Sequence, residues 1–445
     1  MPDPVSPADA TLDDVVALLS ALVAIDSVNP DLDPTRPGEG RIAAFVADWG
    51  RTRGLAVTVV EARPGRPAVL LRAAGAVAIA GVHPAGSEAG SEAGSEAGSA
   101  AGNAAWSAED AIPPRRTLVL NAHLDTVGVH GMEAPFRGRC VGDRLYARGA
   151  MDMKASLAAC MVATAAAVRQ GLRGDVLLTA VPDEEHGSAG TEAAMAALAP
   201  LLAERMSGRA EVAAIVTEPT DLSLHVAHRG FALFDVVLTG RASHTSKPEQ
   251  GVNALTHLGR VLREVEVVDA RLRQRPPHPL LGHGSLQAVL ARGGEELFTT
   301  PAHAEVTLER RTLPGEDAAV VAAEIDDLLA RAGAGEPSFT AAALPGVARE
   351  PFEADPEAAI VRLLQEAIED VTGASPQLLG APYWTDAALV AAAGSPSVAA
   401  AAGPLPTVLF GPVGGGIHRP DEWVDVPSVR TMVRVLQRVI ERYCG

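Results

Sequence analysis

The chain of 445 residues is long enough for two or three domains with a sizeable core. Its formal net charge of −18 argues against nucleic acid or an anionic membrane surface as a partner. Residues 1–4 lack the basic region and apolar core of a signal peptide, and no uninterrupted apolar run approaches transmembrane length, so we expect a cytoplasmic protein without a membrane partner. Cys140, Cys160 and Cys444 are odd in number and widely spaced, which indicates neither a disulfide framework nor a cysteine metal site.

The first predicted elements are two helices within residues 11–54, the second ending at Gly54. Two strands are predicted near 55–61 and 67–72. A tandem Gly-Ser-Glu-Ala repeat follows, and its composition is too polar and glycine-rich to bury an apolar surface. We therefore interpret residues 75–114 as a flexible, low-complexity surface insertion without an assignable function.

The next apolar run, Thr117–Leu120, predicts a buried strand that ends in polar residues. His123 and Asp125 are two residues apart, so on extended chain they point to the same side. The Asp125 carboxylate is then expected to accept the second ring N–H of His123, which would fix the imidazole for binding a metal. A histidine at a strand end is by itself more often an ordinary polar residue, so this pair needs support from elsewhere.

Two further clusters supply that support. Asp152 immediately precedes an alanine-rich helix predicted from Ala155 to Arg169, where a helix N-cap is the ordinary interpretation. The strand predicted over Val176–Val181 leads into the adjacent Glu184 and Glu185, which repel each other unless a cation neutralises them. A solvated acidic loop is the alternative for that pair.

Beyond a strand over Val212–Thr217, which ends at Glu218, the pattern changes. It becomes strand, helix, strand, strand, helix and strand over residues 231–238, 252–265, 285–290, 304–309, 317–332 and 338–343. After a second apparent insertion at residues 398–406, the run Thr407–Phe410 leads through glycines to His418. Four apolar strands that each lead to His, Asp or Glu jointly indicate one site. Two histidines and three carboxylates suffice for two zinc, cobalt or manganese ions about 3.5–4 Å apart.

Seven segments carry a resemblance to a known family. They are His123–Asp125, Gly149–Lys154, Pro182–Glu185, Thr217–Pro219, Ser243–Thr245, Arg310–Glu316 and His418–Glu422. In this order they resemble the acetylornithine deacetylase and succinyl-diaminopimelate desuccinylase family of dinuclear zinc amidohydrolases, which also includes glutamate carboxypeptidases and aminoacylases. The resemblance covers the chain from about residue 10 to its end.

The resemblance implies a ligand set for two divalent ions, with zinc expected first and cobalt or manganese as alternatives. His123 and Glu218 would bind one ion. Glu185 and His418 would bind the other, and Asp152 would bridge both. The resemblance also implies a cis peptide bond directly after the bridging aspartate.

The resemblance further implies three catalytic roles. Asp125 would orient His123. Glu184 would be the general base that takes a proton from a water shared by the two metals. His244 would reach the active site of the partner subunit in a homodimer and stabilise the oxyanion.

Substrate-binding residues are less clearly implied. Arg311 aligns with the arginine that binds the substrate carboxylate in the family, although a structural salt bridge is an equal alternative. Asn253 is a substrate-binding candidate whose position better suits capping or placing a helix. Where many relatives carry asparagine, this chain has Phe298 in the segment Phe298–Pro301, which suggests a pocket of altered polarity.

The implied fold class is α/β, with a catalytic domain in which helices flank a central mixed sheet. That domain would comprise residues 1–226 and 346–445, with a smaller α+β lid and dimerisation domain inserted at 227–345. The favoured function is hydrolysis of the amide bond of a small N-acyl amino acid. A metallo-dipeptidase or carboxypeptidase acting on short peptides is the alternative. A non-catalytic, metal-stabilised binding protein is the third, but its sign would be loss of Glu184 or a ligand, and all are present.

Overall fold

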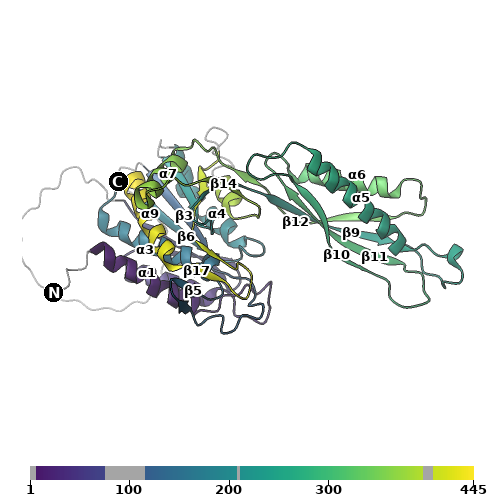
Figure 1. Cartoon of the computed structure of the whole chain (residues 1–445), viewed down its shortest axis with the longest axis horizontal. Helices are drawn as coiled ribbons and strands as arrows, with labels where there is room; N and C mark the ends of the chain where they lie inside the picture. Colours follow the sequence, from purple (N-terminus) through teal and green to yellow (C-terminus); the bar gives the residue numbers. More distant parts are fainter. Residues whose placement is uncertain (1–6, 76–115, 208–210, 394–403) are drawn as a thin grey trace, which may run out of the picture.

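The computed structural model describes residues 7–75, 116–207, 211–393 and 404–445. Apart from Gly75, the insertion predicted at 75–114 lies outside the described residues, as does the insertion predicted at 398–406 up to residue 403. The described residues form a larger part built on a central sheet and a smaller part that extends from it (Figure 1).

The central sheet has the order β1-β2-β6-β3-β7-β15-β8-β13, with β14 also beside β8. Its strands are β1 (Ala56–Arg63), β2 (Arg66–Ala73), β3 (Arg116–His123), β6 (Asp175–Val181), β7 (Glu211–Val216), β8 (Leu224–His228), β13 (Phe352–Glu353), β14 (Leu378–Ala381) and β15 (Thr407–Leu409). The β6-β3-β7-β15 block is parallel, whereas β2-β6 and β15-β8 are antiparallel. The predicted mixed sheet is therefore confirmed.

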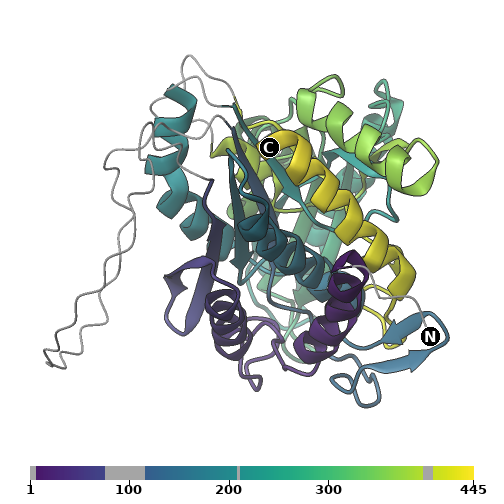
Figure 2. The ribbon, with the colours of Figure 1, turned by 90° about the vertical axis from the view of Figure 1, so that its left-hand side faces the viewer.

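Helices cover both faces of this sheet, which explains why β3 and β6 are almost continuously buried and apolar. One face carries α1 (Pro7–Val23), α2 (Gly40–Thr52), α3 (Ala155–Gln170), α7 (Ala359–Thr372) and α9 (Val426–Cys444). The other carries α4 (Ala189–Ser207) and α8 (Ala387–Ala392). Figure 2 shows α1, α3 and α9 packed side by side on the first face.

Helix α3 is the innermost helix, and every side chain from Ala155 to Ala167 is buried. It follows a short π-helical turn, η1 (Ala150–Lys154). Among the described residues, the stretch Ala150–Gln170 is long and apolar enough overall to cross a membrane, although charged residues interrupt it, and 89% of its 18-residue apolar window is buried inside the fold. Small alanine side chains let neighbouring helices approach closely, so α3 is a core helix.

A small second sheet, of order β16-β17-β5-β4, lies beside η1. Its strands are β4 (Arg139–Val141), β5 (Arg144–Tyr146), β16 (Gly414–Gly415) and β17 (Trp423–Asp425). The loop between β16 and β17 carries His418 and Glu422. This sheet therefore fixes the C-terminal segment against the start of α3.

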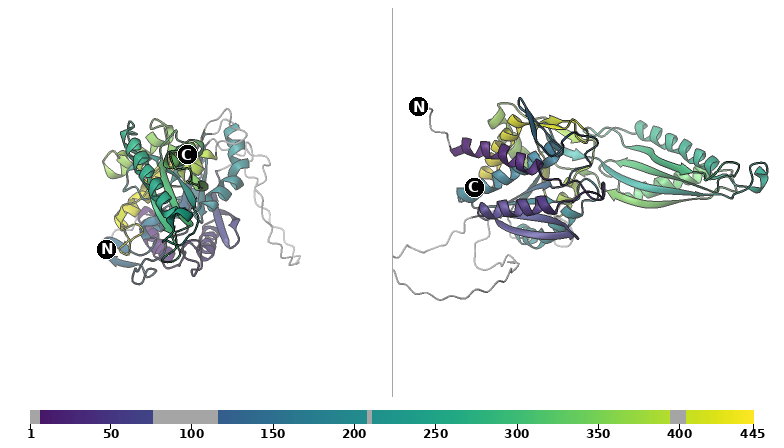
Figure 3. Two further views of the ribbon diagram at one scale, coloured as in Figure 1. Left: turned by 90° about the vertical axis from the view of Figure 1, so that its right-hand side faces the viewer. Right: turned by 90° about the horizontal axis from the view of Figure 1, so that it is seen from below.

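The smaller part, called the lid here, is a four-stranded antiparallel sheet with the order β10-β11-β9-β12. It comprises β9 (Gly230–Thr239), η2 (Pro248–Gln250), α5 (Ala254–Gln274), β10 (Ser285–Gly293), β11 (His303–Thr312), α6 (Ala318–Gly333) and β12 (Ala341–Arg349). Buried and exposed residues alternate along β9 and β11 because α5 and α6 cover one face only. Figure 3 shows the lid projecting from the larger part.

Strand β12 differs from the sequence expectation of a strand over 338–343. It starts at Ala341 and continues to Arg349, and Pro345 lies within it opposite Phe234. Proline is tolerated there because β12 is an edge strand, on which an N–H is not needed for the next pairing. The pairing with β9 shifts register between Pro345 and Ala348, which forms a bulge.

Candidate metal centre and active site

Four of the predicted site residues meet at one edge of the central sheet. His123 is the last residue of β3, Glu184 and Glu185 follow β6, and Glu218 follows β7. These three strands are neighbours and run parallel, so their carboxyl ends lie together. Ligand atoms of His123, Glu184 and Glu218 lie within 4.8 Å of one another.

Asp152, from η1, lies between the two predicted histidine ligands. Its Oδ1 is 3.0 Å from His123 Nε2, and its Oδ2 is 3.5 Å from His418 Nε2. His418 Nε2 is also 3.0 Å from a carboxylate oxygen of Glu185. The Asp152–Met153 peptide bond is cis, as the resemblance implied. Each oxygen of Asp152 thus faces a different imidazole, so the carboxylate could reach two metal ions held by these histidines.

The acidic residues of this cluster are strongly perturbed. Burial, and then the charge of Glu218, raise the pKa of Glu184 well above its ordinary value. Burial and the charge of Asp152 raise the pKa of Glu185 to about 7. Burial also raises the pKa of Glu218, despite the opposing charge of His123. Carboxylates packed this closely ionise together only if cations neutralise them.

In the described structure, the imidazoles of His123 and His418 supply the positive charge that such cations would provide. Hydrogen bonds to Asp152 and Glu185 raise the pKa of His418 to about 10. Burial disfavours a charged His123, but the hydrogen bond to Asp152 outweighs burial and raises the pKa of His123. Metal ligands must be deprotonated, so bound divalent ions would replace these protons. The nitrogen and oxygen donors fit zinc, cobalt or manganese.

Asp125 lies behind the cluster, but its contacts differ from the prediction. His123 Nδ1 donates to the backbone carbonyl of Asp125 at 2.9 Å, while the carboxylate oxygen is 3.6 Å away. The carboxylate instead accepts the backbone N–H groups of Glu184 and Glu185, both at 3.1 Å, and the Asn29 amide at 2.8 Å. Asp125 therefore orients His123 through its main chain and holds the glutamate loop through its side chain.

Glu422 is a supporting residue that the sequence analysis missed. Its carboxylate accepts the backbone N–H groups of Gly149 at 3.0 Å, Met151 at 2.9 Å and Asp152 at 3.2 Å. It also pairs with the buried Arg148 at 2.5 Å. Glu422 therefore fixes the backbone that presents Asp152. The sequence signal that could have identified Glu422 was its position in the segment His418–Glu422, which begins with a predicted metal ligand.

A second acidic group close to the site is already neutralised by arginine. Asp31, Asp183 and His186 place ligand atoms within 4.8 Å of one another. However, Arg66 Nη1 lies 2.6 Å from Asp31 and 2.9 Å from Asp183, and Arg63 lies 2.5 Å from Asp31. Guanidinium groups occupy the positions that a metal would need. We interpret this group as an ion-pair network that supports the loop carrying Glu184 and Glu185.

The predicted lid residues do not join the metal cluster in this chain. Asn253 is the N-cap of α5 and accepts the backbone N–H of Thr256 at 3.1 Å, which matches the capping interpretation. Arg311 lies on β11 with Glu309 2.6 Å away, and its guanidinium is 5.5 Å from the centre of the Phe231 ring. Arg311 is therefore already in an ion pair.

His244 follows the end of β9 that is distant from the central sheet. β9 starts at Gly230, two residues after β8 of the central sheet, and ends at Thr239. His244 is exposed, and its Nδ1 accepts the backbone N–H of Ser246 at 3.1 Å. The ring proton of the neutral imidazole therefore resides on Nε2, which leaves that nitrogen as a hydrogen-bond donor.

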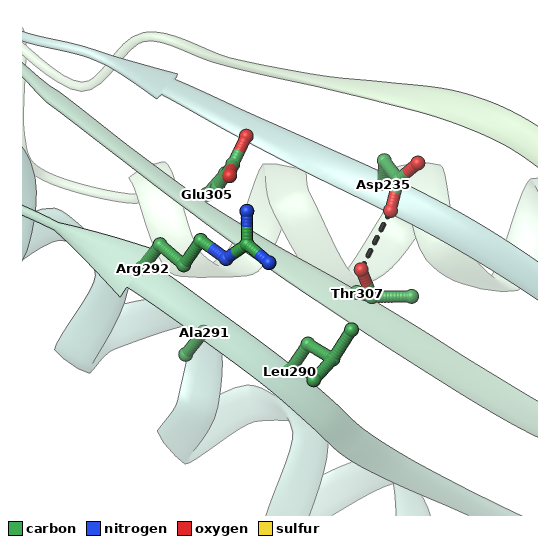
Figure 4. Close-up of a pocket in the computed structure, with 6 residues that line it drawn as sticks. All are labelled: Asp235, Leu290, Ala291, Arg292, Glu305 and Thr307. Atoms are coloured by element: carbon green, nitrogen blue, oxygen red, sulfur yellow. Dashed lines mark hydrogen bonds between the residues drawn. The ribbon is translucent and has the colours of Figure 1, made fainter. Parts of the chain in front are cut away.

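The lid also carries a shallow pocket of about 220 Å³ on the sheet face opposite its helices. It is lined by Asp235, Leu290, Ala291, Arg292, Glu305 and Thr307 (Figure 4). Thr307 donates to Asp235 at 2.7 Å inside it. None of the clustered ligands contributes to this pocket, so it is separate from the candidate metal centre.

Comparison with known proteins identifies the family. Residues 119–442 match the model of peptidase family M20/M25/M40. The chain belongs to this family. It is therefore a metal-dependent hydrolase, with histidine and acidic groups that could hold two metal ions. Membership of this family argues against the third alternative from the sequence, a non-catalytic, metal-stabilised binding protein.

Two proteins with similar sequences are both named acetylornithine deacetylase. Acetylornithine deacetylase of Myxococcus xanthus is 28% identical over 312 residues, which span 68% of this chain and 73% of that protein. Acetylornithine deacetylase of Proteus mirabilis is 27% identical over 345 residues, which span 74% of this chain and 79% of that protein. Both alignments cover about two thirds or more of each chain.

Solved structures share the fold. Aminopeptidase PepT of Bacillus cereus is 17% identical with a TM-score of 0.69, covering 98% of this chain and 99% of that one. A dinuclear metal-binding M20 peptidase of Bacillus subtilis is 13% identical with a TM-score of 0.65, covering 98% and 99%. Human carnosine dipeptidase 1 is 16% identical with a TM-score of 0.65, covering 98% and 97%. The larger part and the lid are thus both found in this family.

Proposed function

We propose that this protein hydrolyses the amide bond of an N-acyl amino acid and releases a carboxylic acid and an amino acid. The observation that carries the proposal is the Asp152 carboxylate placed between His123 and His418, with Glu184 in the same cluster. The relatives named acetylornithine deacetylase, which align with 68% and 74% of the chain, support the choice of substrate class.

The proposed ligands are His123 and Glu218 for one metal ion, Glu185 and His418 for the other, and Asp152 for both. Bound divalent ions, with zinc expected first, would polarise the amide carbonyl and lower the pKa of the attacking water toward about 7. The chain's own part is to hold these five side chains in place. Glu422 does so for Asp152 through three backbone N–H groups.

Glu184 is proposed as the general base. Its carboxylate lies in the same cluster as the proposed ligands His123 and Glu218, where the attacking water would be held. It accepts a proton from water while the water oxygen bonds to the carbonyl carbon. The C–N bond then breaks, and Glu184 passes the proton to the leaving nitrogen. The hydrogen bond from the Glu184 backbone to Asp125 keeps the base in position.

His244 is proposed to act in the partner subunit of a homodimer. Its Nε2–H is a donor at an exposed position of the lid, beyond the far end of β9. Donated to the carbonyl oxygen, this hydrogen bond would strengthen as the oxygen becomes negatively charged in the transition state. Arg311 is proposed to bind the substrate carboxylate, for which its guanidinium fork would have to leave Glu309.

The test is a substrate screen with the purified full chain. N-acetyl, N-succinyl and N-formyl amino acids are assayed beside dipeptides, with zinc, cobalt or manganese and with a chelator as control. We expect release of a free amino acid from N-acyl substrates, abolished by the chelator and by Glu184→Gln. If only substrates with a free α-amino group are hydrolysed, the proposal is wrong and the protein is a dipeptidase.

A further inference from the structure

The His244 segment is joined to a second segment at the distant end of the lid. His244 and Thr299 form an isolated β-bridge, and Thr245 donates its backbone N–H to the carbonyl of Phe298 at 3.0 Å. We call residues 243–247 and 296–300 together the lid tip. Because backbone hydrogen bonds join its two segments, any site that His244 enters also receives Phe298.

The lid tip exposes a large apolar surface. Leu297 is 82% exposed and Phe298 is 73% exposed, the highest values for large hydrophobic side chains in the described part of the chain. Exposed apolar residues that occur singly need no explanation, but two adjacent ones beside a proposed catalytic group form a contact surface.

The backbone of Phe298 is strained. Its φ of +67° lies in the left-handed region, which glycine and asparagine adopt readily and a bulky aromatic residue rarely does. A strained residue persists where the surrounding structure holds it, and such residues concentrate at functional sites. The chain therefore keeps a phenyl ring at a position where asparagine would fit with less strain.

We propose that Phe298, with Leu297 beside it, contacts the acyl group of the substrate in the active site of the partner subunit. The preferred substrates are then N-acyl amino acids with an extended apolar acyl chain, and not those with a charged one. This inference rests on the proposed function, in which His244 donates to the carbonyl oxygen. The carbon of that carbonyl carries the acyl chain on one side and the amide nitrogen of the amino acid on the other. The amino-acid half bears a charged carboxylate, so the apolar Leu297 and Phe298 match the acyl chain.

The expected size of the effect follows from the contact. One methylene in a fully enclosed hydrophobic pocket changes kcat/KM by roughly 10–200-fold. A phenyl ring covers only one side of an acyl chain, so its effect on kcat/KM should lie at the low end of that range. We therefore expect Phe298→Asn to reduce kcat/KM about 10-fold for a long apolar acyl chain.

The experiment uses one amino acid bearing N-acetyl, N-hexanoyl or N-succinyl groups, with the metal-loaded full chain. Wild-type protein is expected to favour the hexanoyl substrate. Phe298→Asn should remove that preference by lowering kcat/KM for the hexanoyl substrate more than for the N-acetyl substrate. It should leave the solution mass and melting temperature no lower, because asparagine suits the left-handed backbone. The control Val59→Asn alters an exposed apolar residue of β1 and should leave the preference unchanged.

Each contrary result overturns the inference in a recognisable way. An equal change for all three substrates means that Phe298 does not select the acyl group. A lower solution mass for Phe298→Asn means that the lid tip is a subunit contact instead. Failure of the proposed function looks different, because wild-type protein would then hydrolyse none of the three amides, or His244→Ala would be fully active.

Discussion

The metal cluster and the lid tip hold their functional groups in opposite ways. His123 is 1% exposed and Glu218 is 5% exposed, and both are held among buried partners at the edge of the central sheet. His244 and Phe298 are exposed, and backbone hydrogen bonds between the two segments of the lid tip hold them in place. The five proposed metal ligands come from one chain, whereas the lid tip is proposed to act beside a partner subunit. The predictions below test that difference.

Replacing Glu184 with glutamine should have the largest effect. The proposed general base is lost while the proposed ligands stay, so kcat should fall by roughly 10²–10⁴-fold with two metal ions still bound. Steady-state kinetics and metal analysis of the same sample measure both quantities. Loss of a metal ion together with activity would show that Glu184 is a ligand, which its distance from His123 and Glu218 also permits.

His244→Ala should reduce kcat by roughly 10²–10³-fold, because one oxyanion donor is removed. The decisive measurement mixes this variant with Glu184→Gln after subunit exchange. In a random mixture half of the dimers are hybrids, and each hybrid has one site with both groups intact. Activity should return to about a quarter of the wild-type value, as follows from two-fold symmetry. No recovery, or an active monomer, would show that the lid tip acts within its own chain or not at all.

Glu422→Gln should weaken metal binding by about 10–100-fold, the usual cost of losing a residue that orients a ligand. Arg148 would lose its carboxylate partner and Asp152 would be less firmly held. Competition with a coloured chelator measures the affinity. Asp421→Asn is the matched control, because Asp421 is adjacent but exposed and paired only with Arg419. Equal affinities of the two variants would contradict the role of Glu422.

The pH dependence of stability should reveal the charge of the metal cluster. The pKa of Glu185 is raised to about 7 from an ordinary value of 4.5, so the metal-free folded chain binds more protons than the unfolded chain between these values. Its contribution to stability therefore falls as the pH rises from 4.5 to 7. Bound metal removes this penalty, so the gap in melting temperature between metal-loaded and metal-free protein should widen from pH 5 to 8. A constant gap would oppose this account.

The sequence predicted the elements better than it predicted their contacts. The periodicity of residues 231–332 identified two lid helices and three of its strands because one lid face is buried and the other exposed. It ended β12 too early because Pro345 indicates an end in most strands, and only the sheet order shows that β12 is an edge.

Within the candidate site, motifs identified the residues that meet but not those that hold them. Asn29 binds Asp125 across 96 positions, and Arg66 lies 2.9 Å from Asp183, which no local pattern connects. Asp125 was assigned to the correct place, but its carboxylate binds backbone N–H groups and not the imidazole ring. Such contacts depend on how distant segments pack, so they need the three-dimensional structure.

The contact between Glu422 and Asp152 also governs when the enzyme can become functional during its own synthesis. The two residues are 270 positions apart, and His418 belongs to the same late segment. A ribosome makes the chain from the N-terminus, so a nascent chain holds Asp152 long before it holds the carboxylate that fixes it. The candidate metal centre therefore assembles only after residues 418–422 have been made, and a chain terminated before them lacks it.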